Sequence, residues 1–518
     1  MSYKKICLAL FIGFFGMQAK GVEAATKAEP TVVIAVNFQD QNVMQKDTYY
    51  HNLIFDLKQK SVANYYKEIS YGKIQINPVK ETAGIKNDGI IRVNVASKHP
   101  DVGGEYAERS TLVHSVLKEA LKKADPYINY AQYDKNKDGK ISRDELHIIF
   151  VFAGFDTAMI NKSPSIWSHS GSLYDVYKVD NVQIGNYEND GGYIIVGDKG
   201  YEKSIGNTTK SSYLPSSIGV YAHEFGHEFN LPDLYDADGS SPGIGPYSLM
   251  SNGMFGSLED KKERHGETPV HMDAWSKIKA GFVKPTVVTK SGEYTMYEST
   301  NPHYNVLKIP TSNQYQYYLV ENRQLKGFDA GLKGFGEKHG GIAIWYINDE
   351  VWGNADEDNK QVSLINAGER AGQMGYSDYQ PFFRKGYVDR FGLYKEKETI
   401  LTNGKRTNVS IVVKNGSSSK MRVQVTVPKE TVKYKEIEKP ANFKASVVTK
   451  NSVTLTWNAV KDASYYIVTQ NGEEVYRGKN LTFTDKNLSP NSSYGYTVRS
   501  SNGYYESEYS IIELYTKK

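Results

Sequence analysis

The sequence of 518 residues contains a single cysteine, Cys7. Cys7 lies in the apolar segment 6–17, which follows two lysines and precedes a small-residue site at 22–24. A basic, then an apolar, then a small-residue segment is typical of a secretory signal peptide, so we expect residues 1–24 to be removed by cleavage after Ala24. The exported chain then contains no cysteine, which excludes disulfide bonds as a source of its stability.

Two further absences narrow the class of protein. No segment after the leader approaches ~18 uninterrupted apolar residues, so the sequence predicts no transmembrane helix. The 63 lysine and arginine residues nearly balance the 59 aspartate and glutamate residues, and the net charge is +4. No basic stripe is present, so the electrostatic footprint of a nucleic-acid-binding protein is missing. We therefore expect a secreted, extracellular protein that does not bind nucleic acid.

A metal-binding pattern is present at 223–233, with the sequence HEFGHEFNLPD. Apolar residues recur with helical spacing over 217–229, which predicts a helix with one buried face. His223 and His227 are four residues apart, so they project from the same face and can both bind one zinc ion. Glu224 lies about 100° around the helix from His223, so we expect it to hold the water rather than the metal.

A third ligand, Asp233, requires this helix to stop. Ten residues of continuous helix would carry Asp233 about 15 Å along the axis from His223. Asn230 readily takes the left-handed conformation that ends a helix, and Pro232 prevents the helix from resuming. The chain can therefore turn back and bring Asp233 beneath the histidines. The alternative is a thermolysin-like zinc hydrolase, in which a glutamate from a later helix is the third ligand; Glu259 is the available candidate.

The downstream segment 245–253 (GPYSLMSNG) is similar to the methionine-containing turn of the metzincin superfamily, in which Met250 would form an apolar floor beneath the metal. Together with HEFGHEFNLPDLYD, this turn resembles the immune inhibitor A-like family of secreted bacterial metallopeptidases. Further similarities lie at 32–40, 62–74, 271–285 and 318–327 and in the following GGIAIWYIND, and they span most of 30–425. The family usually has glycine where this chain has Asn230.

The resemblance implies a zinc-dependent endopeptidase that hydrolyses proteins or peptides outside the cell. In such an enzyme zinc polarises the scissile carbonyl and lowers the pKa of its water towards ~7. Glu224 would accept the proton of this water as general base and pass it to the leaving amine. Tyr235, Tyr247 and His169 are candidates for stabilising the oxyanion, although we favour packing or hydrogen bonding in the wall of the site for all three.

The segment 134–145 (DKNKDGKISRDE) matches the ligand positions of an EF-hand calcium loop, with Gly139 at the sharp turn. The expected ligands are oxygen atoms of Asp134, Asn136, Asp138, Lys140 through its backbone carbonyl, Ser142 directly or through water, and Glu145 through both carboxylate oxygens. The apolar segment 146–152 that follows predicts a buried strand instead of an exiting helix. We therefore expect a structural calcium ion that links a helix to a sheet.

The order of elements predicts a multidomain protein. Residues 25–285 combine expected strands at 31–38, 73–79, 89–95, 145–152 and 192–196 with expected helices at 55–69, 105–123 and 271–281, which suits an α/β catalytic domain of the metzincin type. Residues 286–427 contain short strands separated by Gly, Asn and Asp turns, which predicts an all-β accessory module.

The C-terminal part of the chain is expected to be a separate unit. Residues 428–440 are charged and lack apolar periodicity, so they predict a linker. Residues 441–518 resemble a fibronectin type III domain, with Trp457 in its core and Tyr494 at the tyrosine corner. Such a domain can act as a spacer or bind a surface or matrix ligand. A binding protein with a vestigial metal site is therefore the non-enzymatic alternative, and the intact Glu224 argues against it.

Overall fold

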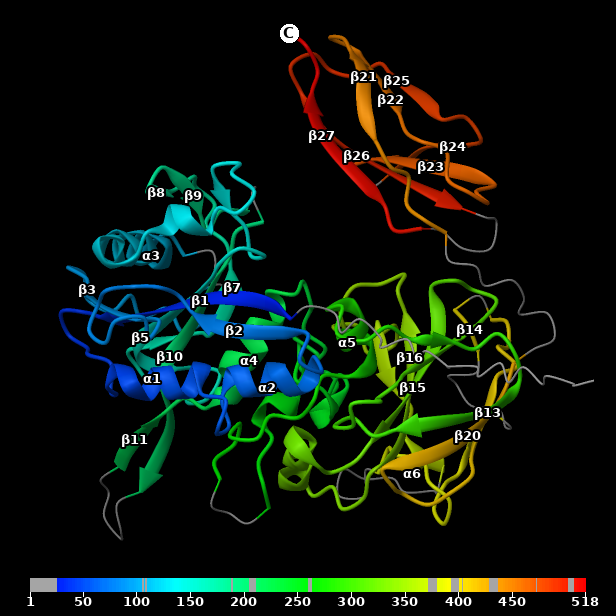
Figure 1. Ribbon diagram of the computed structural model, residues 1–518, viewed down its shortest axis with the longest axis horizontal. Coiled ribbons are helices and arrows are strands. Elements are labelled where there is room, and N and C mark those ends of the chain that lie inside the picture. Colours follow the sequence, from blue (N-terminus) through cyan, green and yellow to red (C-terminus); the bar gives the residue numbers. More distant parts are fainter. Residues whose placement is uncertain are drawn as a thin grey trace, which may run out of the picture.

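The computed structural model describes residues 26–518, apart from 105–106, 108–109, 188–189, 205–210, 260–262, 371–379, 393–399, 403, 428–436, 472 and 502–506. The expected signal peptide and most of the expected linker lie outside the described residues. The described chain forms three units that consist largely of β-sheet, as Figure 1 shows. No helix among the described residues has the length and apolar character needed to cross a membrane.

The first unit is built on an eight-stranded, mostly parallel sheet. Its main path runs β11-β10-β5-β1-β2, with β3 beside β1, β6 beside β5 and β7 beside β10. Every residue of the central strand β5 is buried, which explains its continuous apolar sequence. The strands are β1 (Lys27–Asn37), β2 (Ile74–Pro78), β3 (Ile90–Asn94), β5 (His147–Asp156), β6 (Ser165–Ile166), β7 (His169–Gly171), β10 (Tyr193–Ser204) and β11 (Ser211–Pro215).

Helices cover this sheet, and Figure 1 shows α3 on the opposite side of it from α1 and α2. A small separate sheet contains β4 (Lys140–Ile141), β8 (Lys178–Val179) and β9 (Val182–Ile184). The α-helices are α1 (Asp47–Phe55), α2 (Val62–Ile69), α3 (Thr111–Ala124), α4 (Ile218–His227) and α5 (Ala274–Lys279). The 3-10 helices of this unit are η2 (Asp125–Tyr127), η3 (Tyr130–Tyr133), η5 (Gly245–Tyr247) and η6 (Asn252–Phe255).

The helix predicted over 55–69 is wrong in its first part. Helix α1 ends at Phe55, and α2 begins only at Val62. The side chain of Ser61 accepts a hydrogen bond from the backbone N–H of Asn64, and this N-cap starts a new helix. Asp56 similarly accepts a hydrogen bond from the backbone of Lys58, which favours a turn between the two helices.

The second unit contains a five-stranded sheet, β12-β14-β15-β16-β17, and a four-stranded sheet, β13-β20-β19-β18. The first core continues into this unit and includes Leu319 and Trp345, so the division expected at residue 285 does not separate two independent cores. The elements are β12 (Thr286–Val287), β13 (Gly292–Tyr297), β14 (Leu307–Pro310), β15 (Gln316–Arg323), η7 (Gly327–Phe335), β16 (Gly341–Asn348), β17 (Val362–Leu364), α6 (Ala367–Arg370), β18 (Arg390–Phe391), β19 (Ser410–Val413) and β20 (Lys420–Thr426).

Buried charges connect the first two units. Arg323, at the end of β15, has no exposed side-chain surface and forms an ion pair with the equally buried Asp329. The Nη1 atom of Arg323 also donates a hydrogen bond to the backbone oxygen of Tyr247 in the first unit at 3.1 Å. The backbone N–H of His271, also in the first unit, donates to Asp329 at 3.0 Å. Because a buried charge is costly without its partners, these contacts fix the second unit against the first.

The third unit has three strands in one sheet, β21-β22-β25, and four in the other, β24-β23-β26-β27. Trp457 lies in its core, and the hydroxyl of Tyr494 accepts a hydrogen bond from the backbone of Ser489, as expected for a tyrosine corner. The strands are β21 (Lys444–Val448), β22 (Ser452–Thr456), β23 (Tyr465–Gln470), β24 (Glu473–Gly478), β25 (Thr482–Lys486), β26 (Ser493–Ser501) and β27 (Ser510–Tyr515).

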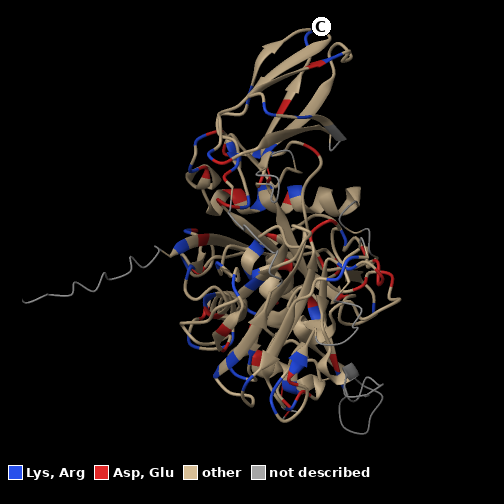
Figure 2. Ribbon diagram, turned by 90° about the vertical axis from the view of Figure 1, so that its right-hand side faces the viewer, with Lys and Arg blue, Asp and Glu red and all other residues tan. Residues whose placement is uncertain are grey.

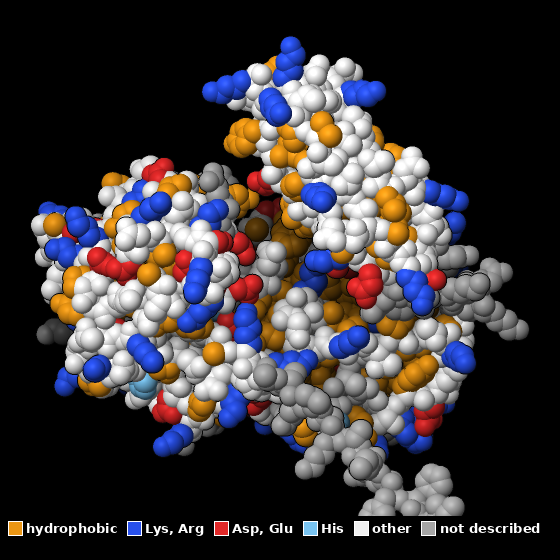
Figure 3. Space-filling view, turned by 45° about the horizontal axis from the view of Figure 1, so that its top comes forward, with side chains coloured by type: hydrophobic (Ala, Val, Ile, Leu, Met, Phe, Trp, Pro, Cys, Tyr) orange, Lys and Arg blue, Asp and Glu red, His pale blue; other side chains and the backbone are white. Residues whose placement is uncertain are grey.

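The surface shows mixed charge and one pronounced hollow. Lys and Arg residues are interspersed with Asp and Glu residues along the ribbon (Figure 2). On the face turned towards the viewer in Figure 3, the molecule is hollowed between the lobe on the left and the column at the upper right, and hydrophobic side chains line the base.

Arg499 of the third unit donates a hydrogen bond to the hydroxyl of Tyr315 in the second unit at 3.3 Å.

Candidate metal centre

The metal-binding pattern lies on α4 and on the chain reversal that follows it. Helix α4 ends at His227, and Asn230 has a φ of 56°, so it takes the left-handed conformation that the sequence predicts. The chain then turns back, and the backbone N–H of Leu234 donates a hydrogen bond to the backbone oxygen of Met250 at 2.7 Å. This reversal brings Asp233 to the same place as His223 and His227.

The three side chains direct one ligand atom each to a common point. The Oδ1 atom of Asp233 lies 3.1 Å from Nε2 of His223 and 3.4 Å from Nε2 of His227. A tetrahedral zinc ion with bonds of about 2.0–2.1 Å separates its ligand atoms by about 3.3 Å, so these spacings fit a zinc ion. Asp233 Oδ1 is buried and lacks a well-formed hydrogen bond. Within the described ranges, no other group of three His, Cys, Asp or Glu side chains converges in this way.

Backbone carbonyls orient both imidazole rings. The Nδ1 atom of His223 lies 2.9 Å from the backbone oxygen of Leu249, and Nδ1 of His227 lies 2.7 Å from that of Leu231. Because a carbonyl can only accept, each Nδ1 carries a proton, and Nε2 is the nitrogen that can lose its proton and bind a metal. The sequence did not reveal these partners, because any residue supplies the same carbonyl group.

The electrostatics of the group suit a divalent cation. Burial alone lowers the pKa of His227, but the Asp233 and Glu224 carboxylates outweigh burial and raise this pKa to about 9. Burial raises the pKa of Asp233, and the two histidines reverse that effect and hold it far below its usual range. Asp233 therefore stays ionised, and the negative potential that attracts a proton to His227 also attracts a metal ion.

Glu224 lies beside the three ligand atoms without joining them. Its Oε2 atom is 4.0 Å from Nε2 of His227, and it is not a member of the converging group. Burial raises the pKa of the Glu224 carboxyl, and the nearby histidines offset part of this rise. A buried carboxylate next to the metal position can exchange a proton with a water molecule there.

Met250 lies directly against α4 between the two histidines. Met250 is fully buried. A Cβ atom placed on Gly226 would collide with the Met250 sulfur, so the helix can rest on Met250 only because residue 226 is glycine. The methyl group of Met272 approaches the same position at 3.4 Å.

Of the three aromatic residues predicted near the site, only Tyr235 stacks on a ligand. Its ring centroid is 6.1 Å from that of His223, and the planes differ by 25°. The hydroxyl of Tyr247 donates a hydrogen bond to Glu337 of the second unit at 3.2 Å. His169 is buried on β7, and its Nδ1 atom lies 2.8 Å from a backbone oxygen. Tyr247 and His169 therefore have partners in the wall of the site.

Glu259, the alternative third ligand, is exposed and is not part of the converging group. The chain from 256 to 259 forms no helix. The thermolysin-like alternative requires this glutamate on a helix that faces the histidines. The geometry therefore favours Asp233.

A buried ion network holds the C-terminal end of α4. Glu228 follows His227, and its side chain is completely buried. One carboxylate oxygen lies 3.1 Å from Nδ1 of His147 on β5, and the other accepts hydrogen bonds from Arg143 and from Ser170 on β7, both at 3.1 Å. Burial raises the pKa of Glu228, but His147 and Arg143 outweigh burial and hold the pKa below its usual range. The carboxylate therefore anchors the helix to the sheet.

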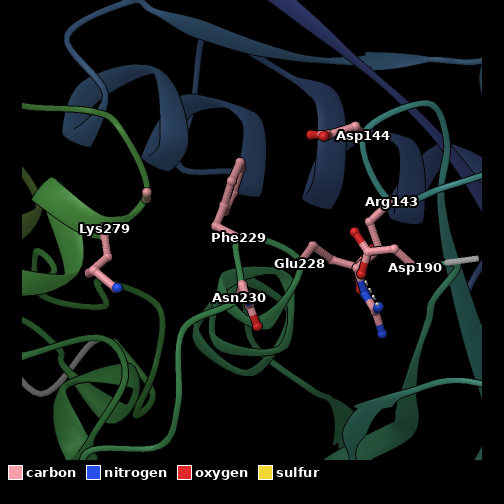
Figure 4. A pocket seen from close by; sticks show the side chains of 8 residues that line it. Arg143, Asp144, Asp190, Glu228, Phe229, Asn230 and Lys279 are labelled. Carbon is pink, nitrogen blue, oxygen red and sulfur yellow. Dashed lines mark hydrogen bonds and ion pairs between the residues drawn. The ribbon is translucent and has the colours of Figure 1, made fainter. Parts of the chain in front are cut away.

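A pocket of about 220 Å³ adjoins this network. Figure 4 shows Arg143, Asp190 and Glu228 on one side of the pocket and Lys279 on the other. Arg143 is already paired with both carboxylates. The pocket contains none of the three converging ligands, so it is separate from the metal centre.

In the loop predicted to bind calcium, acidic side chains accept hydrogen bonds from the backbone of the loop itself. Both Glu145 oxygens accept backbone hydrogen bonds from within the loop, from Lys135 at 2.8 Å and from Ser142 at 3.1 Å. Asp134 accepts one from Gly139, whose φ of 79° allows the sharp turn. The loop leads from η3 into β5, so the predicted strand is confirmed. An all-oxygen donor set of this kind suits a hard cation such as calcium.

A comparison with protein families identifies the chain. A model described as immune inhibitor A peptidase M6, catalytic domain, matches residues 17–283, which is more than half of the chain. The chain belongs to the immune inhibitor A peptidase family. Membership of this family indicates a metallopeptidase, and the matched segment contains the converging histidines and aspartate.

Other similarities of this immune inhibitor A family member are short. A 59-residue stretch is 39% identical to a poly(3-hydroxybutyrate) depolymerase from Ralstonia pickettii, so the chain spans only 12% of that relative and the match covers 11% of this chain. A fibronectin type III domain of a human collagen alpha-1(XX) chain is 23% identical, with a TM-score of 0.16, over 17% of this chain and 92% of that one. A chitinase from Bacillus thuringiensis is 22% identical, with a TM-score of 0.16, over 17% of this chain and 15% of that one.

We predict that Gly226→Ala disturbs the candidate metal centre of this immune inhibitor A family member. The new methyl group must displace the Met250 side chain or α4, and such overpacking costs about 1–3 kcal/mol. Thermal unfolding and zinc titration should show a lower melting temperature and weaker zinc binding. Gly104→Ala is the control, because nothing lies within 4 Å of a Cβ at Gly104. Equal behaviour of the two variants would show that the Met250 contact does not constrain α4.

Proposed function

We propose that this protein is a secreted zinc endopeptidase that hydrolyses peptide bonds in extracellular proteins. The observation that carries the proposal is the convergence of His223, His227 and Asp233, whose ligand atoms have the spacing of a zinc site. Membership of a metallopeptidase family supports it. We also assign the first unit to the metzincin type of α/β domain, with Met250 as the floor of the site.

Residues of this chain supply the remaining parts of the reaction. When bound, zinc polarises the scissile carbonyl and lowers the pKa of a water molecule to about 7. Glu224 accepts the proton of the attacking water and transfers it to the leaving amine, as its buried position beside the ligands allows. The backbone oxygens of Leu249 and Leu231 keep both histidines in the tautomer that binds metal. Tyr235 stacks on His223, so it is the candidate that we assign to contact with the oxyanion.

Two other functions were considered. A thermolysin-like hydrolase with Glu259 as ligand is less consistent with the site, because Glu259 is exposed outside the converging group. A binding protein that acts only through its third unit would need neither oriented histidines nor a buried Glu224. The third unit keeps a proposed role as a spacer or as a module for a surface or matrix ligand.

We predict that Glu224→Gln abolishes most hydrolysis and leaves zinc bound. The amide has nearly the same shape but cannot accept the proton, and loss of a general base typically costs about 10²–10⁴-fold in rate. Peptide hydrolysis and zinc content should be measured on the same purified sample. Persistent hydrolysis with full zinc content would rule out Glu224 as the base.

We predict that Asp233→Ala lowers the zinc content, because it removes the only oxygen of the converging group. Metal analysis after dialysis should show a content well below that of the unchanged protein. Glu259→Ala is the matched control and should retain its zinc. The reverse result, with zinc lost only from the Glu259 variant, would support the thermolysin-like alternative.

We further propose that the loop 134–145 binds one structural calcium ion. Its predicted ligands are the oxygens of Asp134, Asn136, Asp138, Lys140, Ser142 and Glu145. The position of Glu145 supports this proposal, because its carboxylate accepts hydrogen bonds from the loop backbone at Lys135, Asn136 and Ser142. The fully buried strand β5 directly follows, so a cation here would tie the loop to the central sheet.

We predict that calcium raises the melting temperature through this loop. A ligand at 100 times its dissociation constant stabilises the folded protein by about 2.7 kcal/mol. Calorimetry with increasing calcium should show the rise in the unchanged protein and its loss in Asp138→Ala. Asp144→Ala changes an exposed carboxylate in the same loop that is not a predicted ligand, so it should keep the rise. A melting temperature that does not respond to calcium would contradict the proposal.

A further inference from the structure

A loop of the second unit, residues 349–361 between β16 and β17, lies against the segment that carries Asp233. Asn354 in this loop is only 1% exposed, and its Nδ2 atom donates a hydrogen bond to the backbone oxygen of Leu234 at 3.1 Å. A Cβ atom placed on Gly353 would lie 3.6 Å from the backbone oxygen of Asp233, so the two backbones are close to van der Waals contact. The second unit therefore reaches the residue next to the third metal ligand.

Two more hydrogen bonds join the same two segments. The Nζ atom of Lys360 donates a hydrogen bond to the backbone oxygen of Gly243 at 3.1 Å. The hydroxyl of Ser240 donates one to the carboxylate of Glu357 at 3.0 Å. Lys360 and Ser240 are both accessible to solvent, whereas the hydrogen bond from Asn354 to Leu234 is buried. Water therefore competes least with the hydrogen bond of Asn354.

The backbone of Leu234 is held at both of its polar groups. Its N–H donates to the oxygen of Met250 at 2.7 Å, and its oxygen accepts from Ile244 at 3.1 Å as well as from Asn354. The N–H of Leu234 belongs to the peptide group that begins at the Asp233 carbonyl. A rotation of the main chain at Asp233 would therefore have to break these hydrogen bonds, so the backbone from which the Asp233 carboxylate projects is held in place.

Asn354 is itself fixed by the second unit. Its Nδ2 also donates to the backbone oxygen of Val362 at 2.8 Å, and its Oδ1 accepts from the N–H of Val362 at 3.0 Å, where β17 begins. At the other end of the loop, Asp349 accepts hydrogen bonds from Trp275 at 2.9 Å and from Tyr317 at 2.8 Å. The amide that contacts Leu234 is thus rigidly supported.

We propose that Asn354 is a positioning residue for the third metal ligand, supplied by the second unit. The proposal rests on the proposed zinc site. Asn354 contacts neither the metal position nor the substrate; it acts through Leu234, by keeping the Asp233 carboxylate where the two histidines need it. A protein binds a metal more tightly when the ligating side chain is already in position, because less conformational entropy is lost on binding.

The test measures metal binding in the full-length protein. Zinc affinity should be determined by competition with a chelator, and the visible absorption of the cobalt(II)-substituted protein should report the ligand geometry. Asn354→Ala should weaken zinc binding about tenfold, at the low end of the range for residues that support ligands, because the Leu234 oxygen keeps its bond from Ile244. The cobalt absorption should shift as well.

Two further variants separate positioning from general stability. Asn359 lies in the same loop and accepts a 2.9 Å hydrogen bond from the side chain of Asn348 at the end of β16, so Asn359→Ala should lower the melting temperature and leave zinc affinity unchanged. Asn354→Asp keeps the size of the side chain and the acceptor for the Val362 N–H, but loses the amide donations to the backbone oxygens of Leu234 and Val362. It should therefore weaken zinc binding, and it provides the test if the alanine variant does not fold.

The outcomes distinguish this inference from the proposed function. Normal zinc affinity and an unchanged cobalt spectrum in both Asn354 variants would overturn the inference, as would an equal loss of affinity in Asn359→Ala. If the unchanged protein binds no zinc, or keeps its zinc when Asp233 is replaced, the proposed site fails and this inference fails with it.

Discussion

The candidate centre depends on one chain reversal after α4. Two histidines one helical turn apart supply two nitrogen atoms, but the third ligand reaches them only because Asn230 takes a left-handed conformation and the following backbone returns to Met250. The spacings of 3.1 and 3.4 Å between Asp233 and the histidines are the result. The same region provides the ring orientation, because Leu231, in the reversal itself, accepts the hydrogen bond that fixes His227.

The second unit contacts the segments that form the candidate metal centre, although the family model ends at residue 283. Arg323 donates to the backbone of Tyr247, three residues before Met250, and Asn354 donates to the backbone of Leu234, one residue after Asp233. Both contacts are buried, and the Arg323 side chain is paired with Asp329 in the interior. Apolar residues also join the two units, because the hydrophobic core of the first unit includes Trp345 of the second. The second unit therefore supports the first unit near Met250 and near Asp233.

The sequence predicted much of the secondary structure, and its error in the helix over 55–69 has a local cause. Strands such as β1 and β5 were recognised from continuous apolar segments. Such segments are expected in a parallel sheet because both of its faces are buried. The helix expected over 55–69 was divided by side-chain capping at Ser61, which periodicity does not report. For Tyr247 the sequence favoured a hydrogen bond over contact with the oxyanion, but it could not identify the partner, because Glu337 lies 90 residues away.

By itself the sequence indicated which side chains could bind a metal and where the helix must end. The four-residue spacing of His223 and His227, the adjacent Glu224 and the stop at Asn230 follow from helix geometry and backbone sterics, which act within a few residues. Only the tertiary structure decided what surrounds these groups. The carbonyls that orient the histidines, the fit of Met250 against Gly226 and the contact from Asn354 join distant segments through backbone atoms or close packing. Such contacts leave no periodic pattern in the chain, because they depend on how the whole fold closes.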